Sequence, residues 1–320
     1  MGIINAHEEK GMDAVLTVII PAYNEADSLP VVLPPLIDYC FSRNWKIILI
    51  NDGSTDKTPE ILKEFEPQPN FKVIHHKVNR GYGGALKSGI LAADTEFMVT
   101  IDADGQHVVN DIDLMLAAMR AQDADLVVGR RRGGGKVHLY RETGKKIIRT
   151  IASILMTLPI YDINSGFKLY RSELAKLYLA VCPDGMSFSD IITLTFVNQR
   201  HKVIETDIHI KERVAGSSSI STRTAFETVQ EIINVVMLFH PLKIFLPLSL
   251  VIILIGILWG IPFAVLGHGI SVGSMLAIVT GLLLLFLGLI AEQISNLQRN
   301  IIELKREFQI QKVIQNTDHQ

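Results

Sequence analysis

The chain has 320 residues, of which 48% are hydrophobic and only 20% are charged. Soluble domains carry about 25% charged residues, and the shortfall here is concentrated in residues 244–291, which contain no Asp, Glu, Lys or Arg. This composition excludes a purely soluble protein, a disordered chain and a small disulfide-stabilised domain. The net charge of −2 gives no indication of a nucleic-acid partner.

Residues 15–131 alternate apolar runs with helix-like stretches. Nearly continuous apolar strands separated by helices are typical of a mostly parallel α/β sheet covered on both faces. Ligands of such sheets bind at the carboxyl ends of the strands. The predicted strands are 15–23, 46–52, 71–76, 97–104 and 125–129, and the predicted helices are 27–42, 58–65, 84–93 and 110–121.

Polar motifs follow three of these strands: PAYNE at 21–25, NDGSTD at 51–56 and DADGQH at 102–107. The third motif is the strongest local signal. Asp102 and Asp104 are expected to point the same way from an extended strand, and a carboxamide oxygen of Gln106 follows them. Such a hard, oxygen-rich set suits Mg²⁺ or Mn²⁺. A turn or a helix cap is the alternative interpretation.

The segment RGYGGA, residues 80–85, opens a predicted helix. Its glycines predict a close approach of the backbone to a ligand, and a helix N-terminus attracts phosphate. The segment is not GxGxxG, and the chain has no P-loop lysine motif, so dinucleotide and Walker-type sites are disfavoured. Asp52 beside it is interpreted as an acceptor for a nucleobase N–H, with an Asx turn as the alternative.

Two stretches predict amphipathic helices close to a membrane. Residues 140–158 place apolar side chains at helical spacing beside Lys145, Lys146 and Arg149, as in helices that lie in an anionic headgroup layer. Residues 222–242, rich in Ile, Val, Leu and Phe, predict a juxtamembrane helix. For both, an ordinary core-facing helix is the alternative.

The charge-free block divides into residues 244–266 and 270–291, joined by Gly267-His268-Gly269. A spanning helix needs about 20 residues, so the pair predicts a transmembrane helical hairpin within residues 243–291. Basic residues flank its outer ends, which predicts that both ends, and the α/β domain that precedes them, face the cytoplasm. A buried helix pair in a soluble core is the alternative.

Residues 292–320 predict a cytoplasmic C-terminal helix with an apolar stripe. The stripe follows a spacing of three and four residues, which is typical of a short coiled coil. It predicts either subunit pairing or contact with the bilayer surface. Its members are Ile294, Leu297, Ile301, Leu304 and Phe308.

Four motifs in this order resemble the family 2 glycosyltransferases, which have the GT-A nucleotide-sugar fold. Three later segments are similar to the polyprenyl-phosphate sugar transferases, the group that contains dolichyl-phosphate mannose synthase and undecaprenyl-phosphate glucosyl-type transferases. The resemblance covers roughly residues 15–225. The four motifs are VIIPAYNEADSLP (18–30), INDGSTDKT (50–58), NRGYGGALKSGI (79–90) and TIDADGQH (100–107), and the later segments are GRR (129–131), NSGFKLYR (164–171) and KERVAGSSSIS (211–221).

The resemblance implies roles for matching residues on the donor side. The metal ligands would be Asp102, Asp104 and Gln106, which would hold the diphosphate through Mg²⁺ or Mn²⁺. The residues that would bind the nucleotide are Pro21, Tyr23, Glu25, Asp52 and Asp102.

On the acceptor side, the resemblance implies that Arg131 and Arg213 contact the acceptor phosphate, and Lys168 stands where the family usually has arginine. With Asp104, these three are the predicted catalytic residues. Asp190 is a candidate for orienting a sugar hydroxyl, with a helix cap as the alternative. The family's GESK lysine is replaced by Ser219, and Arg223 is the candidate replacement.

The resemblance implies an enzyme with a catalytic domain over residues 1–221 and two membrane spans. It would transfer one sugar, with inversion, from a uridine or guanosine diphosphate sugar to dolichyl or undecaprenyl phosphate. Because a phosphate monoester has a second pKa of about 6, it is already a nucleophile and needs no general base. A homo-oligomer is expected, with a tetramer favoured by the resemblance. A synthase that extends a polysaccharide or glycolipid, which usually carries QxxRW, and a non-catalytic membrane scaffold are the alternatives.

Overall fold

The structure is a computed structural model that describes residues 14–131, 160–211, 237, 240–269 and 271–317. The described residues form two compact units, an α/β unit that ends at residue 211 and a helical unit that begins at residue 240. The predicted helix 140–158, most of the predicted helix 222–242, and Arg213, Ser219 and Arg223 lie outside the described residues.

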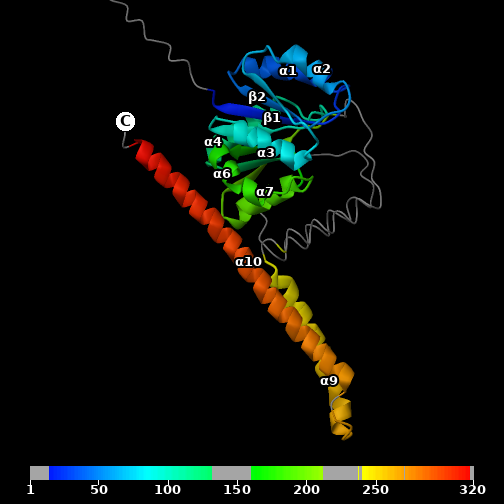
Figure 1. Ribbon diagram of the computed structural model, residues 1–320. Coiled ribbons are helices and arrows are strands. Elements are labelled where there is room, and N and C mark those ends of the chain that lie inside the picture. The colour runs from blue at the N-terminus through cyan, green and yellow to red at the C-terminus, as the bar shows by residue number, and fades with distance from the viewer. Residues whose placement is uncertain (1–13, 132–159, 212–236, 238–239, 270, 318–320) are drawn as a thin grey trace, which may run out of the picture. The chain divides into compact units, whose positions relative to one another are not determined.

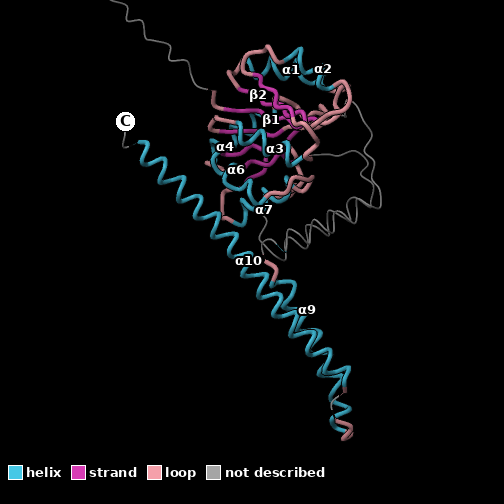
Figure 2. Tube along the Cα trace, in the orientation of Figure 1, coloured by secondary structure: helices cyan, strands magenta, loops and turns pink. Residues whose placement is uncertain are grey.

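The α/β unit is built on a seven-stranded sheet with the order β3-β2-β1-β4-β6-β5-β7 (Figures 1 and 2). Strand β6 runs antiparallel to its neighbours β4 and β5, and the other pairs are parallel. The predicted α/β class with a mostly parallel sheet is therefore confirmed. The strands are β1 Leu16–Ala22, β2 Lys46–Asn51, β3 Phe71–His75, β4 Phe97–Thr100, β5 Leu126–Arg131, β6 Lys168–Arg171 and β7 Val203–Ile208.

Helices cover both faces of the sheet. Alternate residues of β1 point to opposite faces, so they contact different helices. Val18 and Ile20 lie in one apolar core with helices α1 and α4. On the other face, α3 approaches closely, and a Cβ added at Gly89 would lie 2.5 Å from Ile19 Cγ2. The helices are α1 Leu29–Phe41, α2 Thr58–Phe65, α3 Tyr82–Ala92, α4 Asp111–Gln122, α6 Ser172–Tyr178 and α7 Phe188–Asn198, with the 3₁₀ helix η1 Leu179–Val181.

Strand β4 is shorter than the sequence predicts. It ends at Thr100 rather than at Asp104. The chain turns there because Asp104 Oδ1 accepts the backbone N–H of Gln106 at 3.1 Å, and Gly105 adopts φ 74°. Ile101 and Ala103 are both buried, which explains why the apolar pattern continues beyond the strand. Asp102 and Asp104 therefore lie beyond the end of the strand, with Asp104 in the turn.

The helical unit consists of α9, Leu242–Val265, and α10, Val272–Thr317. Helix α9 and the Val272–Ile301 part of α10 are long and apolar enough to cross a membrane, with mean hydropathies of 2.7 and 2.5. Only 11% and 17% of the residues in their apolar windows are buried, unlike those of a helix in a soluble core. Helix α10 continues without a break past residue 291, so the predicted C-terminal helix is an extension of the second span.

Small side chains recur on α10 at every seventh position, where α10 lies along α9 (Figure 1). Ser274 and Ser295 are each 2% exposed. A Cβ added at Gly281 would lie 2.5 Å from Ile253 Cγ1, and one at Gly288 would lie 2.5 Å from Phe245 Cβ. Such small residues let two membrane helices approach closely. The seam consists of Ser274, Gly281, Gly288 and Ser295.

Because of this close packing, two glycines of α10 should differ in how well they tolerate substitution by alanine. We expect Gly281→Ala to destabilise the hairpin by about 1–3 kcal/mol, because its methyl group would overlap Ile253. Gly273→Ala is the matched control, since an added Cβ would meet only ordinary contacts at 3.7–3.8 Å. Thermal unfolding of the detergent-solubilised protein measures both. Equal melting temperatures for the two variants would contradict the close packing at Gly281.

Candidate active site

The loops after β1 and β2 are joined into one fixed edge. Asn24 donates its N–H to Ser54 Oγ at 3.0 Å and accepts the N–H of Thr55 on its Oδ1 at 2.8 Å. The backbone N–H of Glu25 donates to Thr58 Oγ1 at 2.9 Å. This edge carries the predicted nucleotide residues Pro21, Tyr23 and Glu25, of which Tyr23 is 45% exposed. An exposed aromatic ring beside fixed backbone is suited to contact a flat base.

Asp52, predicted to bind a nucleobase, is almost fully occupied by protein contacts. Its Oδ1 lies 2.6 Å from His76 Nδ1 and accepts the N–H of Arg80 at 2.9 Å, while Oδ2 accepts the N–H of Gly81 at 2.9 Å. The side chain is 4% exposed. His76 Nε2 in turn lies 2.8 Å from Ser88 Oγ on α3. This chain of contacts fixes the start of α3 against the sheet.

The glycines at the start of α3 serve contacts within the protein. The N–H of Gly84 donates to the carbonyl of Asp184 at 3.0 Å, and a Cβ added at Gly83 would lie 2.4 Å from the carbonyl oxygen of Pro183. Together with the Asp52 bonds to Arg80 and Gly81, these contacts engage three of the backbone N–H groups in the segment that the sequence analysis linked to phosphate. The segment 183–185, rather than a ligand, is what approaches the glycines.

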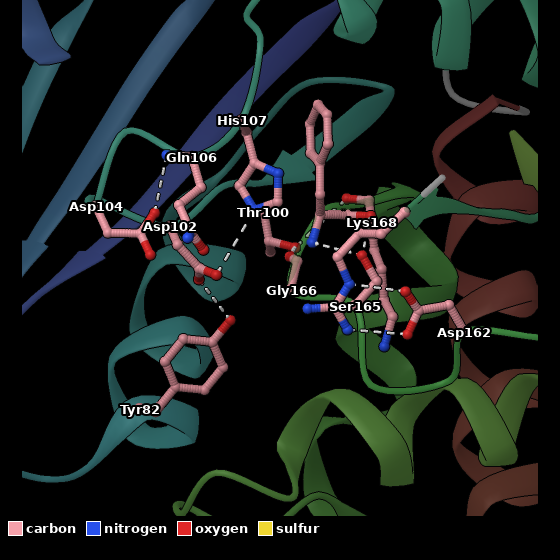
Figure 3. Close-up of polar contacts among 12 residues, drawn as sticks. Tyr82, Thr100, Asp102, Asp104, Gln106, His107, Asp162, Ser165, Gly166 and Lys168 are labelled. Atoms are coloured by element: carbon pink, nitrogen blue, oxygen red, sulfur yellow. Dashed lines mark hydrogen bonds and ion pairs between the residues drawn. The ribbon is translucent and has the colours of Figure 1, made fainter. Parts of the chain in front are cut away.

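Asp102 lies at the centre of the site, directly after β4 (Figure 3). Its Oδ1 accepts the hydroxyl of Tyr82 at 3.0 Å, and its Oδ2 lies 3.7 Å from Nε2 of His107. Burial on its own raises the pKa of Asp102, but His107, Tyr82 and Arg131 together hold the pKa below its ordinary value. The side chain is therefore an anion at neutral pH, and 33% of its surface remains exposed.

The other two predicted metal ligands follow in the turn. Asp104 is 7% exposed and bonds the backbone of Gln106. Figure 3 shows Asp102, Asp104 and Gln106 on one loop. Among the described residues, no group of three His, Cys, Asp or Glu side chains could hold a metal ion without help. A cation here would need oxygens from a substrate, as is usual for Mg²⁺ at phosphates.

Arg131, predicted to contact the acceptor, ends β5 and pairs with Asp162. Its Nε and Nη2 donate to the two carboxylate oxygens at 2.8 and 3.0 Å, a bidentate geometry of the strong type. Asp162, with Asp102 and Asp190, raises the pKa of Arg131 and so keeps the cation charged. Glu205 of β7 fixes the loop, because its Oε1 accepts the N–H groups of Tyr161 and Asp162 at 2.5 and 2.6 Å.

Lys168 lies on β6 beneath this loop and has no exposed surface. Its Nζ donates to the carbonyl of Ile163 at 2.8 Å and to the carbonyl of Ser189 in α7. Burial lowers its pKa from 10.5 to about 8, against the opposing effect of Asp190 and Asp162. Asp190 is in the first turn of α7. Lys168 therefore joins the segment before β6 to helix α7.

Several residues of the site have no individual role in the sequence-based interpretation. The partner of Asp52 is His76, and Asp102 is flanked by Tyr82, His107 and Gly166. The carboxylate of Asp162 completes the Arg131 pair. Tyr82, His107 and Gly166 belong to motifs that the sequence singles out, but His76 and Asp162 follow no recognisable spacing. Only the sheet order brings these side chains to one edge.

A comparison with known families identifies the chain. The profile of glycosyl transferase family 2 matches residues 17–179, just over half of the chain. The chain belongs to this family. It is therefore an enzyme of sugar transfer, and the sequence-based recognition is confirmed. The profile described as the GtrB C-terminal hairpin matches residues 240–297, which identifies α9 and the first part of α10 as a membrane hairpin.

Curated relatives and solved structures agree with this assignment. The undecaprenyl-phosphate 4-deoxy-4-formamido-L-arabinose transferase of Photorhabdus laumondii is 28% identical over 93% of this chain and 94% of its own length. The enzyme of the same name from Pectobacterium carotovorum is 32% identical over 64% of this chain and 62% of its own. Glucosyl-3-phosphoglycerate synthase of Mycobacterium tuberculosis, solved with Mn²⁺, UDP-glucose and phosphoglyceric acid, superposes with a TM-score of 0.54 at 17% identity, covering 70% and 79% of the two chains. It shares the fold.

The lowered pKa of Lys168 predicts how the stability of the transferase depends on pH. Between pH 8 and 10.5 the unfolded chain binds more protons at this residue than the folded one, so its cost to folding falls as the pH rises through this window. We expect the melting temperature of the wild type to rise relative to Lys168→Met from pH 8 to 10. A constant difference between the two melting curves over that range would contradict the buried ammonium.

Proposed function

We propose that this transferase moves a single sugar, with inversion, from a nucleoside diphosphate sugar to a polyprenyl phosphate in the membrane. The observation that carries the proposal is that Asp102, directly after β4, and Arg131, at the end of β5, lie at the same edge of the sheet, because both strands pair antiparallel with β6 in between. The Asp102 carboxylate suits a metal-bound diphosphate, and the Arg131 guanidinium suits a phosphate acceptor. A membrane hairpin in the same chain and the undecaprenyl-phosphate relatives support a lipid acceptor.

The residues fit a divalent cation, Mg²⁺ or Mn²⁺. Asp102 is anionic and partly exposed, and Asp104 offers a second carboxylate in the same turn. With Gln106 they would supply only part of a coordination shell, and the diphosphate of a uridine or guanosine nucleotide would supply more of it. When bound, the cation would act as a Lewis acid on the diphosphate leaving group.

On the acceptor side, the protein has to place an anion rather than remove a proton. The lipid phosphate carries between one and two negative charges at neutral pH, so its oxygen is a nucleophile without a general base. Arg131 would orient that oxygen, and Asp162 and Glu205 hold Arg131 and its loop in place. Arg213, Arg223 and Asp190 remain further candidates for contacts to the phosphate or the sugar.

Transfer of a labelled sugar tests the function directly. Purified full-length protein, Mn²⁺ and undecaprenyl or dolichyl phosphate should convert one uridine or guanosine diphosphate sugar into a glycosylated lipid phosphate. Asp104→Ala should abolish this conversion with the fold intact, because the bond from Asp104 to the backbone of Gln106 is local to the turn. Growth of a polysaccharide or glycolipid chain instead, or unchanged turnover in Asp104→Ala with chelator, would refute the proposal.

Two neighbouring arginines separate the acceptor role from general charge. Arg131→Ala should lower kcat/KM for the lipid phosphate by roughly tenfold to a hundredfold, as expected for a charge-assisted contact of about 1.5–3 kcal/mol. Arg130→Ala is the matched control, because Arg130 pairs instead with Asp207 and Glu205. Calorimetric affinity for the nucleotide should change little in both. Loss of nucleotide affinity in Arg131→Ala with normal acceptor saturation would reverse the assignment.

We also propose that the catalytic domain faces the cytoplasm and that the enzyme is a homo-oligomer, with a tetramer favoured. Both outer ends of the hairpin would lie on the cytoplasmic side. The described part of the apolar stripe supports pairing through α10, because its side chains are 51–64% exposed; they are Ile294, Leu297, Ile301 and Leu304.

Labelling and particle mass test these two points. Both native cysteines are buried, and burial raises their pKa values to about 12, so His268→Cys would provide the reactive thiol. We expect an impermeant maleimide to label it from outside the cell, and Leu297→Asp to reduce the mass of the detergent-solubilised particle. Labelling only from the cytoplasmic side would contradict the topology, and a monomeric mass in the wild type would contradict the assembly.

A further inference from the structure

The two oxygens of the Asp102 carboxylate face different side chains, one through a hydrogen bond and the other through a longer contact with an imidazole. The Tyr82 hydroxyl donates to Oδ1 at 3.0 Å, and His107 Nε2 lies 3.7 Å from Oδ2 (Figure 3). Tyr82 begins α3, and His107 follows the turn after β4. Because the two contacts come from separate elements, they fix the rotation of the carboxylate as well as its position.

A third element shapes the space around this carboxylate. A Cβ added at Gly166 would lie 2.7 Å from Asp102 Oδ2 and 2.9 Å from the Tyr82 hydroxyl. The backbone at Gly166 is itself fixed, because its carbonyl accepts the hydroxyl of Thr100 at 2.7 Å. The absence of a side chain at this position therefore lets the Tyr82–Asp102 pair lie against the loop before β6.

His107 is directed at Asp102 by packing. Its side chain is 7% exposed, and its ring lies 4.8 Å from that of Phe167, centroid to centroid. Its Nδ1 is buried and has no hydrogen-bond partner among the described residues. The polar group that this imidazole faces is the Asp102 carboxylate. A buried ring nitrogen without a hydrogen-bond partner lowers the stability of the fold. This cost favours a role for His107 at the Asp102 carboxylate.

We propose that Tyr82 and His107 are positioning residues that orient the Asp102 carboxylate toward the divalent cation of a bound nucleoside diphosphate. The inference rests on the proposed function, since it assumes that Asp102 is a metal ligand. A carboxylate can accept about four hydrogen bonds or coordination bonds. The two contacts leave other lone pairs of Asp102 free to coordinate a cation, and 33% of the side chain is exposed. Partners of this kind typically change metal affinity by about 10–100-fold.

The structure offers a matched control for each variant. Tyr39 donates its hydroxyl to Asp113 at 2.6 Å, so Tyr39→Phe removes a bond of the same kind between α1 and α4. His201, whose side chain is 9% exposed, has a nitrogen 3.4 Å from Asp125, so His201→Gln matches His107→Gln. Neither control residue contacts Asp102 or Arg131 in the described structure.

Binding of Mn²⁺ is measured by electron paramagnetic resonance on the full-length protein with saturating UDP or GDP. Tyr82→Phe and His107→Gln should each weaken Mn²⁺ binding by about 10–100-fold, while Tyr39→Phe and His201→Gln leave it unchanged. Adding Tyr82→Phe to Asp102→Ala should cause no further loss, because Tyr82 acts through Asp102. Excess Mn²⁺ should restore turnover to Tyr82→Phe.

The outcomes separate this inference from the proposed function. If the wild type binds Mn²⁺ with nucleotide and Tyr82→Phe binds it equally well, the positioning role is wrong and the function stands. A further loss on adding Tyr82→Phe to Asp102→Ala would also refute it. If the wild type binds no Mn²⁺ with either nucleotide, the metal-dependent function fails and the inference fails with it. Should His107→Gln not fold, Tyr82→Phe, which removes one hydroxyl, decides the question.

Discussion

Parallel pairing of β1 with both β2 and β4 is the constraint on which the active site depends. The carboxyl ends of three strands meet at one edge because of it, so loops that are 25 to 80 residues apart in the chain become neighbours. The chain then reverses direction across the sheet at β1, and such switch points are where open α/β sheets bind ligands. The insertion of antiparallel β6 beside β4 brings Gly166 and Asp162 to the same edge.

Acidic and basic side chains lie at this same edge of the sheet. Asp102 and Asp104 form the anionic side, and Arg131 forms the cationic side, with Asp162 and Glu205 holding it. Buried lysine is expensive unless it is paired or hydrogen-bonded, and Lys168 meets that requirement with two backbone carbonyls. These two contacts tie the segment before β6 to helix α7.

The sequence predicted strands β1 to β5 because they are continuous apolar runs, but it did not predict β6 and β7. The sequence also identified the DADGQH motif as a ligand-binding candidate, but it extended β4 through Asp104. The reason is that the apolar residues Ile101 and Ala103 continue the pattern of the strand. The glycines of α3 were assigned to phosphate, since a sequence cannot distinguish a backbone that meets a ligand from one that meets residues 183–185. The sequence could not predict the Arg131–Asp162 pair, because Asp162 is brought to Arg131 by the pairing of β6. That strand is four residues long, and its place in the sheet is set by tertiary contacts.

The central claim is that the turn after β4 binds a divalent cation together with a nucleoside diphosphate. Anomalous diffraction at the manganese edge, from crystals grown with Mn²⁺ and UDP or GDP, tests it most directly. The account predicts one anomalous peak within coordination distance, about 2.0–2.3 Å, of both an Asp102 or Asp104 carboxylate oxygen and a diphosphate oxygen. A bound nucleotide whose diphosphate has no manganese beside it, or a peak away from this turn, would contradict it.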